Sequence, residues 1–341
     1  MTTVLEVNDL RTSFRTDDGI VQAVDGVSFA VQKGETLGIV GESGSGKSVT
    51  CLTVMGLNDR RAATSTGSVL LDGQEILGVS SADLQEIRGT RMAMIFQDPM
   101  TSLNPVYRVG WQIEEQIRAH MELSKQAAHA RAIELLAAVG IPHPAQRVDD
   151  YPHQFSGGMR QRVMIAMALS CNPDILIADE PTTALDVTIQ AQILDLIKKL
   201  RDDFRTAVVL ITHDMGVVAD LADRIAVMYA GRIIEQGSRR DIFYDARHPY
   251  TWGLLGSIAR LDRPKPRRLT AIPGLPPSLL RLPKGCAFAA RCPHRFGLCD
   301  ERPDLLDRAG DGHLDACHLD LRQKEDLREA TIHPELIEEA K

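Results

Sequence analysis

The sequence has no long apolar run and no excess of basic charge. No stretch approaches the roughly 18 consecutive apolar residues that a membrane-spanning helix needs, and the first residues lack a signal-peptide pattern. Acidic side chains outnumber basic ones, which gives a formal net charge of -7. An affinity for nucleic acid that depends on a basic surface is therefore not expected. We expect a cytosolic protein that reaches a membrane only through other proteins.

Aromatic residues and cysteines are also scarce. Aromatic residues make up 4% of the 341 residues, and only six cysteines are present. Because thiols in the cytosol stay reduced, these cysteines indicate core packing, a metal or a cluster rather than disulfides. The length allows two domains, or one large core with an appendage.

One glycine-rich stretch stands out against this ordinary composition. Residues Gly41–Ser48 read GESGSGKS and fit the phosphate-binding pattern G-x-x-x-x-G-K-[ST]. An apolar run at 36–40 predicts a short buried strand before it, and Val49 onward predicts a helix after it. In that setting, backbone N–H groups and the helix N-terminus face a polyphosphate. We expect a nucleoside triphosphate here, with Lys47 at its β- and γ-phosphates and the Ser48 hydroxyl on Mg²⁺.

Alternating patterns on both sides of this loop predict further strands. Residues 4–9 and 22–32 alternate with the period of half-buried strands, a turn is expected at 16–19, and another strand at 67–73. These segments indicate an antiparallel sheet beside the phosphate-binding core. Phe14 is expected in the loop between the first two strands, either as a buried aromatic or as a platform for an adenine ring.

The middle of the chain changes from strand to helix periodicity. A buried strand is predicted at 91–96, and it ends at Gln97 in a loop that runs to Pro105. Helices are expected from Val106 and again from Ser124, because apolar residues recur there at helical spacing. We therefore expect a small helical insertion within an α/β core.

Three short polar clusters follow predicted strands or open predicted helices. Ser156, Gly157 and Gly158 precede a helix and predict either an anion-binding N-terminus or an ordinary cap. Asp179 and Glu180 end a hydrophobic strand whose carboxyl edge suits a ligand, with Asp179 holding Mg²⁺ through water and Glu180 polarising a water molecule. Capping of the next turn is the alternative for this acidic pair. His213 ends another apolar strand, where it contacts either a γ-phosphate or its own neighbours.

The order of these motifs resembles that of ABC-type ATPase domains, over about residues 1–240. The series comprises the P-loop, Gln97, Ser-Gly-Gly, Asp-Glu, Ala-Leu-Asp at 184–186 and His213. The resemblance implies an α/β fold with a RecA-like P-loop core, an antiparallel β-subdomain, and a helical subdomain at about 106–170. A C-terminal extension at 241–341 follows. It also implies that two such domains stack head to tail, with ATP between them.

The resemblance further implies roles for individual residues. It implies that Phe14 stacks on adenine, that Gln97 contacts Mg²⁺ and reports to a transporter, and that Glu180 is the general base. One departure is that the signature before Arg160 contains Phe155 and Met159 where the family usually has Leu and Gln. The remaining implied roles are phosphate and Mg²⁺ binding by Ser43, Gly44, Ser45, Gly46, Lys47 and Ser48, Mg²⁺ binding through water by Asp179, contact with the partner's γ-phosphate by Ser156, Gly157 and Gly158, bridging of the dimer by Asp186, and orientation of the γ-phosphate by His213.

A narrower resemblance is to the ATP-binding subunits of oligopeptide and dipeptide importers. Residues 97–105 (QDPMTSLNP), 155–169, 178–186 and 248–250 carry it, together with 272–286 in the extension. It implies a peripheral protein on the cytoplasmic face of the membrane. The implied partners are a related but non-identical ATPase, two membrane subunits that contact the loop after Gln97, and, indirectly, an extracytoplasmic peptide-binding protein.

Other cargoes and other classes of protein remain open at this point. Nickel, glutathione and opine importers use similar subunits. A soluble ABC ATPase acting on DNA or ribosomes normally has two ATPase domains in one chain or a long coiled-coil insertion, whereas here the helical insertion is short and the net charge is acidic. A regulatory module without turnover would be expected to lack Glu180 or His213, and both are present.

The C-terminal cysteines suggest a second site. Cys286, Cys292, Cys299 and Cys317 lie in a region broken by glycine and proline, and their spacing does not match a zinc knuckle. Four thiolates suit zinc or a [4Fe–4S] cluster, and unliganded cysteines are the remaining alternative. The importer resemblance favours the cluster.

The other two cysteines and the charged C-terminal segments invite simpler interpretations. Cys51 and Cys171 are interpreted as core residues. The basic run 263–268 is interpreted as a solvated linker, and the tail from Asp320 as a surface helix.

Overall fold

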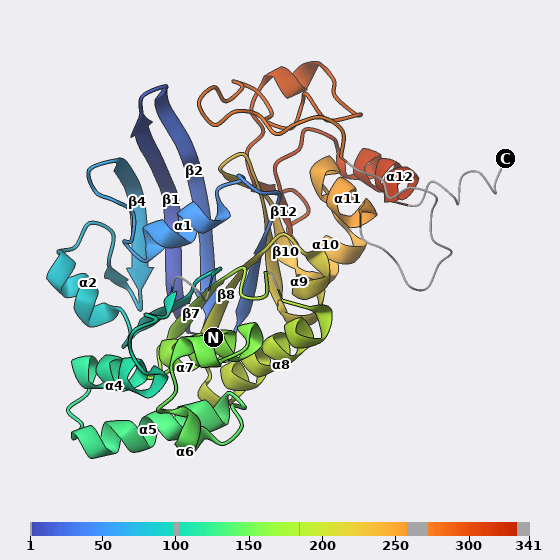
Figure 1. Cartoon of the computed structure of the whole chain (residues 1–341). Helices are drawn as coiled ribbons and strands as arrows, with labels where there is room; N and C mark the ends of the chain where they lie inside the picture. Colours follow the sequence, from blue (N-terminus) through green and yellow to red (C-terminus); the bar gives the residue numbers. More distant parts are fainter. Residues whose placement is uncertain (1, 99–101, 184, 258–271, 333–341) are drawn as a thin grey trace. The chain divides into compact units, whose positions relative to one another are not determined.

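The computed structural model describes residues 2–98, 102–183, 185–257 and 272–332, which form two compact units (Figure 1). The first unit comprises Met1–Glu6, Ala30–Thr36 and Val69–Ile211, and the second comprises Val7–Phe29, Leu37–Ser68 and Thr212–Lys341. The predicted linker 263–268, residues 99–101 of the loop after Gln97, Ala184 and the tail from 333 lie outside the described residues.

An antiparallel sheet forms from the alternating segments. It has the order β2-β1-β4-β5, with bounds β1 (Thr3–Thr16), β2 (Gly19–Gln32), β4 (Ala63–Leu71) and β5 (Gln74–Glu75). The predicted strands are therefore confirmed but longer, and only Asp17 and Asp18 form the first turn. The prediction that Phe14 lies in a loop is wrong, because β1 continues through it to Thr16 and leaves its side chain half-buried.

The second unit is built on a mixed set of strands. Their order is β11-β12-β10-β9-β3, with β3 parallel to β9 and β9 antiparallel to β10. The predicted strand Thr36–Val40 is β3, and every residue in it is buried, as expected for a parallel strand covered on both faces. The other bounds are β9 (Arg224–Tyr229), β10 (Arg232–Ser238), β11 (Leu306–Asp307) and β12 (Leu314–Asp315).

Helices follow these strands where the sequence supplies caps. Ser238 ends β10, and its side chain caps helix α10 (Arg239–Tyr244), while its own backbone N–H donates to the Asp241 carboxylate. Pro249 occupies the first turn of helix α11 (Pro249–Gly256). In Figure 1, helices α11 and α12 (Leu321–Ile332) lie side by side. The helices of this unit are α1 (Lys47–Val54), α9 (Met215–Leu221), α10 (Arg239–Tyr244), α11 (Pro249–Gly256) and α12 (Leu321–Ile332), with a 3-10 turn, η2, at Gly297–Asp300.

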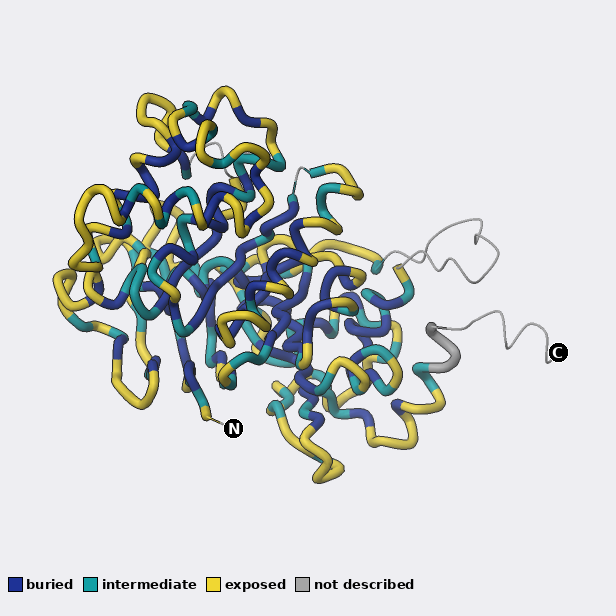
Figure 2. The backbone as a smooth tube through the Cα atoms, turned by 90° about the horizontal axis from the view of Figure 1, so that it is seen from below, coloured by how far each residue is buried: buried dark blue, intermediate teal, exposed yellow. Residues whose placement is uncertain are grey.

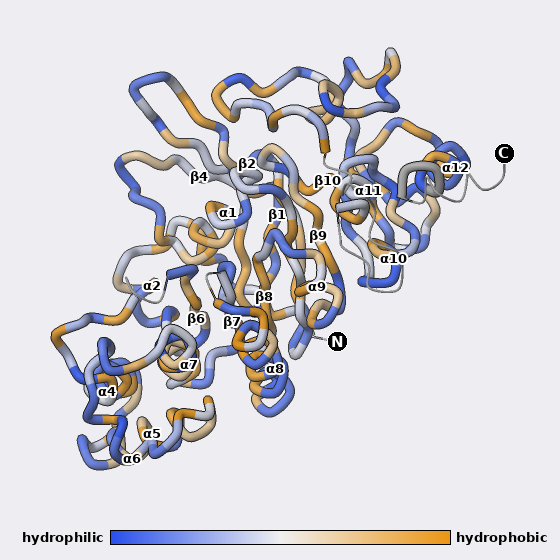
Figure 3. Tube along the Cα trace, turned by 45° about the vertical axis from the view of Figure 1, so that its right-hand side comes forward, coloured by the Kyte–Doolittle hydropathy of each residue, from blue (hydrophilic) through white to orange (hydrophobic). Residues whose placement is uncertain are grey.

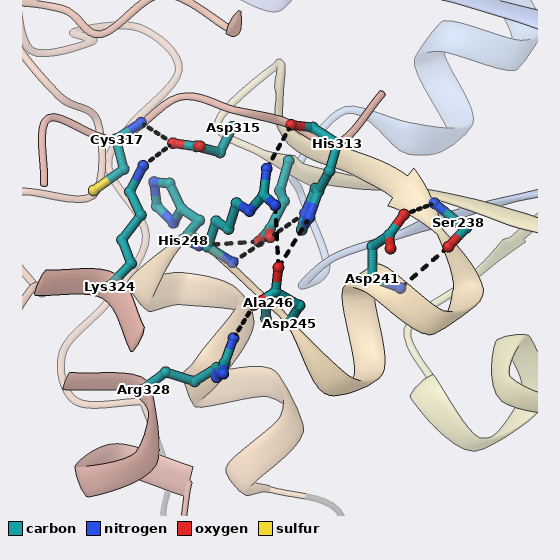
Figure 4. A network of polar contacts seen from close by, with 12 residues as sticks. Ser238, Asp241, Asp245, Ala246, His248, His313, Asp315, Cys317, Lys324 and Arg328 are labelled. Atoms are coloured by element: carbon teal, nitrogen blue, oxygen red, sulfur yellow. Dashed lines mark hydrogen bonds and ion pairs between the residues drawn. The ribbon is translucent and has the colours of Figure 1, made fainter. Parts of the chain in front are cut away.

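The tail of the chain is only partly the surface helix that its charge suggests. Helix α12 forms, but Lys324 within it is 2% exposed and its ammonium lies 2.6 Å from the Asp315 carboxylate. Figure 4 shows this pair in a larger network of polar contacts that includes His313 and Arg328. The C-terminal extension therefore packs partly through charge.

Parallel strands form the centre of the first unit. Their order is β8-β7-β6, with Ala178 opposite both Ile95 and Leu210. Apart from Asp179 and Thr212, which end β7 and β8, their residues are apolar (Figure 3), and all of them are buried (Figure 2), as expected for parallel strands that are covered on both faces. The bounds are β6 (Met92–Ile95), β7 (Ile175–Asp179) and β8 (Ala207–Thr212).

The predicted helical insertion is present in this unit. In Figure 1 the helices of the insertion lie together, and α4 buries Val109, Ile113 and Ile117 at the expected spacing of four. The first helix begins at Val109 rather than Val106, and Ser124 caps the second. The helices and 3-10 turn of this unit are α2 (Ser81–Ile87), α4 (Val109–His120), α5 (Lys125–Ala138), α6 (Pro144–Arg147), η1 (Pro152–Gln154), α7 (Gly157–Ala168) and α8 (Val187–Phe204).

Among the described residues, no helix combines the length and apolarity that crossing a membrane requires.

Candidate active site

The predicted P-loop connects β3 to α1 in the second unit, and its glycines are required by its geometry. Gly44 and Gly46 have φ of +78° and +101°, in the left-handed region that other residues avoid. A Cβ on Gly46 would lie 2.4 Å from the Ala23 carbonyl oxygen. The helix begins at Lys47, directly after Gly46, rather than at Val49. The loop therefore approaches neighbouring backbone more closely than any side chain permits.

The loop surrounds a buried ammonium group. Lys47 is 5% exposed, and its Nζ donates to the carbonyl oxygens of Gly41 at 2.7 Å and Glu42 at 2.9 Å. No side chain caps the N-terminus of α1, because its cap is Gly46. A cation beside a helix N-terminus that lacks a side-chain cap is suited to an anion such as phosphate. Ser43 and Gly44 are exposed, Ser45 is buried and Ser48 is half-buried.

Glu180 follows β7 in the first unit in a strained conformation. Its φ is +47°, which is rare for a residue with a side chain, and its N–H donates to the Ile211 carbonyl at 3.0 Å. Such strain recurs at functional sites, where the surrounding structure holds it in place. The neighbouring Asp179 is 7% exposed.

The structure brings Glu180 and Gln97 together. The Gln97 Nε2 donates to Glu180 Oε2 at 3.0 Å, and the Thr183 hydroxyl donates to the same oxygen at 2.9 Å. The half-buried carboxylate is thus fixed in direction by two donors. Sequence reasoning missed Thr183. Its position three residues after Glu180, in the turn closed by its own N–H, is the local signal that could have identified it.

Ser156 and Asp186 cap helices of the first unit. Ser156 Oγ accepts from the Met159 N–H and caps α7, which begins at Gly157. Asp186 caps α8 by accepting from the Ile189 N–H at 3.0 Å. A Cβ on Gly158 would lie 2.7 Å from Ile189 Cγ2, so this position requires glycine. Both Ser156 and Asp186 remain exposed.

His213 lies in the second unit, immediately after β8. Its side chain is exposed, and the next residue, Asp214, caps α9 by accepting from the Gly216 N–H at 2.7 Å. The P-loop and His213 belong to this unit, whereas Gln97, Ser156, Asp179, Glu180 and Asp186 belong to the first.

The four C-terminal cysteines line one small apolar pocket of the second unit, although they are up to 31 residues apart in sequence. Burial raises the pKa of Cys292 to about 11 and that of Cys317 to about 12. These two thiols are therefore neutral in the absence of a ligand. None of the six cysteines, all of which lie in the described residues, forms a disulfide. Within the described ranges, no three His, Cys, Asp or Glu side chains are arranged to hold a metal ion.

The remaining cysteines agree only in part with their interpretation as core residues. Cys51 is buried within α1, as expected for a core position. Cys171 is half-buried, and its Sγ lies 3.8 Å from the Gln116 carbonyl oxygen. Burial raises the pKa of the Cys171 thiol, so it behaves as a packing residue rather than a nucleophile.

Comparisons with known proteins agree with this geometry. The ABC transporter family model matches residues 24–183, and the model of the oligopeptide/dipeptide transporter C-terminal region matches 234–299. The structure is similar to that of a dimeric, post-hydrolysis state of the ATP-binding cassette MJ0796 bound to ADP and Pi. The TM-score is 0.62 at 29% identity, and the match covers 69% of this chain and 99% of that one.

Curated relatives match over nearly the whole chain. The oligopeptide transport ATP-binding protein OppD of Bacillus subtilis is 54% identical, over 92% of this chain and 88% of its own length. The dipeptide transport ATP-binding protein DppD of the same organism is 54% identical over 94% and 95%, and OppD of Salmonella typhimurium is 53% identical over 92% and 93%. The chain thus belongs to the family of ATP-binding proteins of oligopeptide and dipeptide ABC transporters, and it is an ABC-type ATPase.

Proposed function

We propose that this ATPase powers the import of di- or oligopeptides. The names of its relatives support the cargo class, and the observation that carries the hydrolytic role is the Glu180 carboxylate held at the end of β7 by Gln97 and Thr183. Two membrane permease subunits would receive the energy, with the chain peripheral on the cytoplasmic face. A peptide-binding protein on the other side of the membrane would deliver the cargo.

ATP binding falls to the P-loop in this proposal. Ser43, Gly44, Ser45 and Gly46 present the loop backbone to the phosphates, and Lys47 offsets their charge. Phe14, half-buried in β1, stacks on the adenine ring. The hydroxyl, amide and carboxylate oxygens of Ser48, Gln97 and Asp179 are the hard donors that Mg²⁺ prefers, with Asp179 acting through water. When bound, the ion neutralises charge on the transferring phosphoryl group.

Glu180 performs the chemistry as general base. Its carboxylate accepts a proton from water as that water attacks the γ-phosphate in line with the leaving oxygen. The donors Gln97 and Thr183 orient the carboxylate for this step, and His213 orients the γ-phosphate.

A second ATPase subunit completes each site. We propose that Ser156, Gly157 and Gly158 contact the γ-phosphate bound to a related, non-identical subunit, with Asp186 bridging the pair. The caps at Ser156 and Asp186 leave both side chains exposed, as a dimer contact requires. Reopening of the dimer after hydrolysis is then reported by Gln97 and its loop to the membrane subunits.

The test of hydrolysis uses the assembled importer. Changing Glu180→Gln is expected to lower kcat about 10²- to 10⁴-fold while ATP still binds, because a general base contributes that much. Glu134→Gln, on the exposed face of α5, is the matched control and should retain full turnover. Full turnover in the Glu180→Gln complex would show that another group is the base.

Cargo and partners are tested in native membranes. Affinity purification should recover two membrane permeases and a second ATPase, and peptides should stimulate turnover in the reconstituted complex. Stimulation by nickel, glutathione or opines instead would reassign the cargo, and recovery of ribosomes or DNA without permeases would remove transport altogether.

We also propose a [4Fe–4S] cluster at Cys286, Cys292, Cys299 and Cys317. Four thiolates are the ligand set of such a cluster, and these four line one pocket. Bound there, the cluster would cross-link a segment that has little core of its own. Anaerobic purification should give about four irons and four acid-labile sulfides per chain. Cys286→Ser should lose them, whereas Cys171→Ser should not. Stoichiometric zinc would replace this proposal, and a metal-free folded protein would end it.

A further inference from the structure

A side chain from the segment that carries the four C-terminal cysteines contacts the P-loop. This segment, residues 286–317, is called the cysteine-bearing segment below. Glu42 lies inside the loop, and its two carboxylate oxygens accept from the Arg291 guanidinium at 2.6 and 2.9 Å. The two residues are 249 positions apart, and Arg291 directly precedes Cys292. This fork-to-fork geometry fixes direction as well as distance, unlike a single contact between charges.

Arg291 is held rigidly from several sides. Its side chain is 4% exposed, and its Nε donates to the Pro273 carbonyl at 2.9 Å. The guanidinium also lies over the rings of Tyr229 and Phe288, at 5.8 and 5.9 Å from their centroids. The hydrogen bonds to Glu42 raise its pKa, so its charge is permanent. A buried cation with fixed surroundings sets the position of its half-buried partner, Glu42, rather than the reverse.

The backbone of Glu42 is fixed as well. Its N–H donates to the Tyr250 hydroxyl at 2.8 Å, and its carbonyl oxygen accepts from Lys47 Nζ at 2.9 Å. One residue of the loop is therefore connected on one side to α11 and Arg291, and on the other to the lysine that is proposed to bind phosphate. A displacement of the Glu42 side chain passes to Lys47 through a single peptide unit.

We infer that Arg291 is a positioning residue for the nucleotide site, through which the cysteine-bearing segment sets the affinity of the P-loop for ATP. The inference rests on the proposed function, because it requires ATP phosphates at Lys47. Arg291 does not touch the nucleotide in this arrangement. It holds Glu42 so that the loop is already shaped for phosphate, and the cost of ordering the loop is not subtracted from binding.

Backbone hydrogen bonds within the cysteine-bearing segment fix the position of Arg291. The N–H groups of Arg291 and Cys292 both donate to the Phe288 carbonyl, at 2.9 and 3.0 Å. The Phe288 ring packs against Tyr229 and Tyr250, which carry the other contacts to Arg291 and Glu42. The cysteine-bearing segment and the P-loop are thus connected through consecutive contacts without an intervening mobile side chain.

The test measures ATP affinity in the full chain by calorimetry with Mg²⁺. Arg291→Met keeps most of the side-chain volume and removes the fork, and it is expected to raise the Kd about tenfold. Arg295→Met is the matched control. Arg295 lies in the same segment and pairs with Asp300 on the surface, so the Kd should not change. In the assembled importer, KM for ATP should rise with kcat unchanged, a split that general loss of fold would not produce.

A double-mutant cycle identifies Glu42 as the intermediary. Glu42→Gln should raise the Kd by a similar factor, and Glu42→Gln combined with Arg291→Met should add little further, because both remove one interaction. Arg291→Lys, which keeps the charge but loses the fork, should recover part of the affinity.

Three outcomes would count against different statements. If Arg291→Met melts at a lower temperature but binds ATP as the parent does, Arg291 only supports the fold and the inference fails. If the parent protein binds no ATP, or Lys47→Ala binds it equally well, the P-loop assignment itself fails. Additive effects in the double-mutant cycle would mean that Arg291 acts through another contact.

Discussion

Strand β7 and the C-terminal extension both contain buried residues, but different interactions surround them. In β7, Ile175, Leu176 and Ile177 are covered by apolar neighbours. In the extension, burial includes ions, for example Lys324 paired with Asp315 (Figure 4). Apolar contact is non-directional and tolerates adjustment, whereas a buried ion requires one partner in one place. The two regions should therefore respond differently to mutation and to pH.

Breaking a buried ion pair should have the largest effect. Lys324→Met removes the ammonium that lies 2.6 Å from the buried Asp315 carboxylate and leaves the more distant Arg308 guanidinium, 3.8 Å away, as its cationic partner. The expected cost is about 3 kcal/mol in the free energy of unfolding. Urea denaturation of the full chain measures this, and Lys284→Met, at an exposed position, is the control. Lys324→Met combined with Asp315→Leu should recover much of the loss. No recovery would mean that packing, and not charge, holds α12.

Acidification should have the second-largest effect, by lowering the stability of the C-terminal extension. Burial, reinforced by the charge of Lys324, lowers the pKa of His248 from 6.5 to about 3. Between about pH 6.5 and pH 3, His248 therefore takes up a proton in the unfolded chain but not in the folded one. As pH is lowered through this range, the free energy of unfolding should decrease by up to about 1.4 kcal/mol per pH unit. His248 also caps α11, because its ring nitrogen Nδ1 accepts from the Tyr250 N–H. Its backbone N–H donates to the Glu235 carboxylate.

His248→Asn provides the control for this pH dependence. Asparagine can cap a helix in the same way but does not titrate. Urea midpoints measured between pH 7 and pH 5 should therefore fall less steeply in the variant than in the parent. Parallel slopes would assign the acid sensitivity to other groups.

Strand β7 should show the smallest effect. Ile177→Val removes one methylene from a fully buried position, which costs about 0.5–1.5 kcal/mol. Because no charge is involved, the loss should be the same at pH 5 and pH 7 and insensitive to salt. A loss that varies with pH would remove the contrast with the extension.

The sequence predicted apolar burial well and paired charge poorly, for the same physical reason. The predicted bounds 36–40 are those observed for β3, since a strand covered on both faces is a continuous apolar run. The prediction for Phe14 failed because the polar residues of β1 interrupt its alternation without ending its pairing. The interaction between Glu42 and Arg291 has no local signature, since either residue alone resembles ordinary surface charge.

The candidate site residues show the same difference: the sequence reveals their motifs but not the contacts between them. The Gly44–Ser48 stretch and the acids at 179–180 are visible because phosphate binding and strand-end placement need particular residues at fixed spacing. The hydrogen bond between Gln97 and Glu180 joins residues 83 positions apart, and only the parallel register of β6 and β7 makes them neighbours. The sequence therefore identified the chemical groups, and the fold determined their contacts.

The contact between Glu42 and Arg291 also imposes an order of events during protein synthesis. Ribosomes add roughly 5–20 residues per second, so the P-loop exists for tens of seconds before the arginine 249 residues later has been made. During that interval the growing chain has the glycines and the lysine but not the anchor that holds the loop. The anchored form of the P-loop can therefore exist only after Arg291 has left the ribosome. A prematurely terminated chain would carry an intact P-loop motif without its anchor.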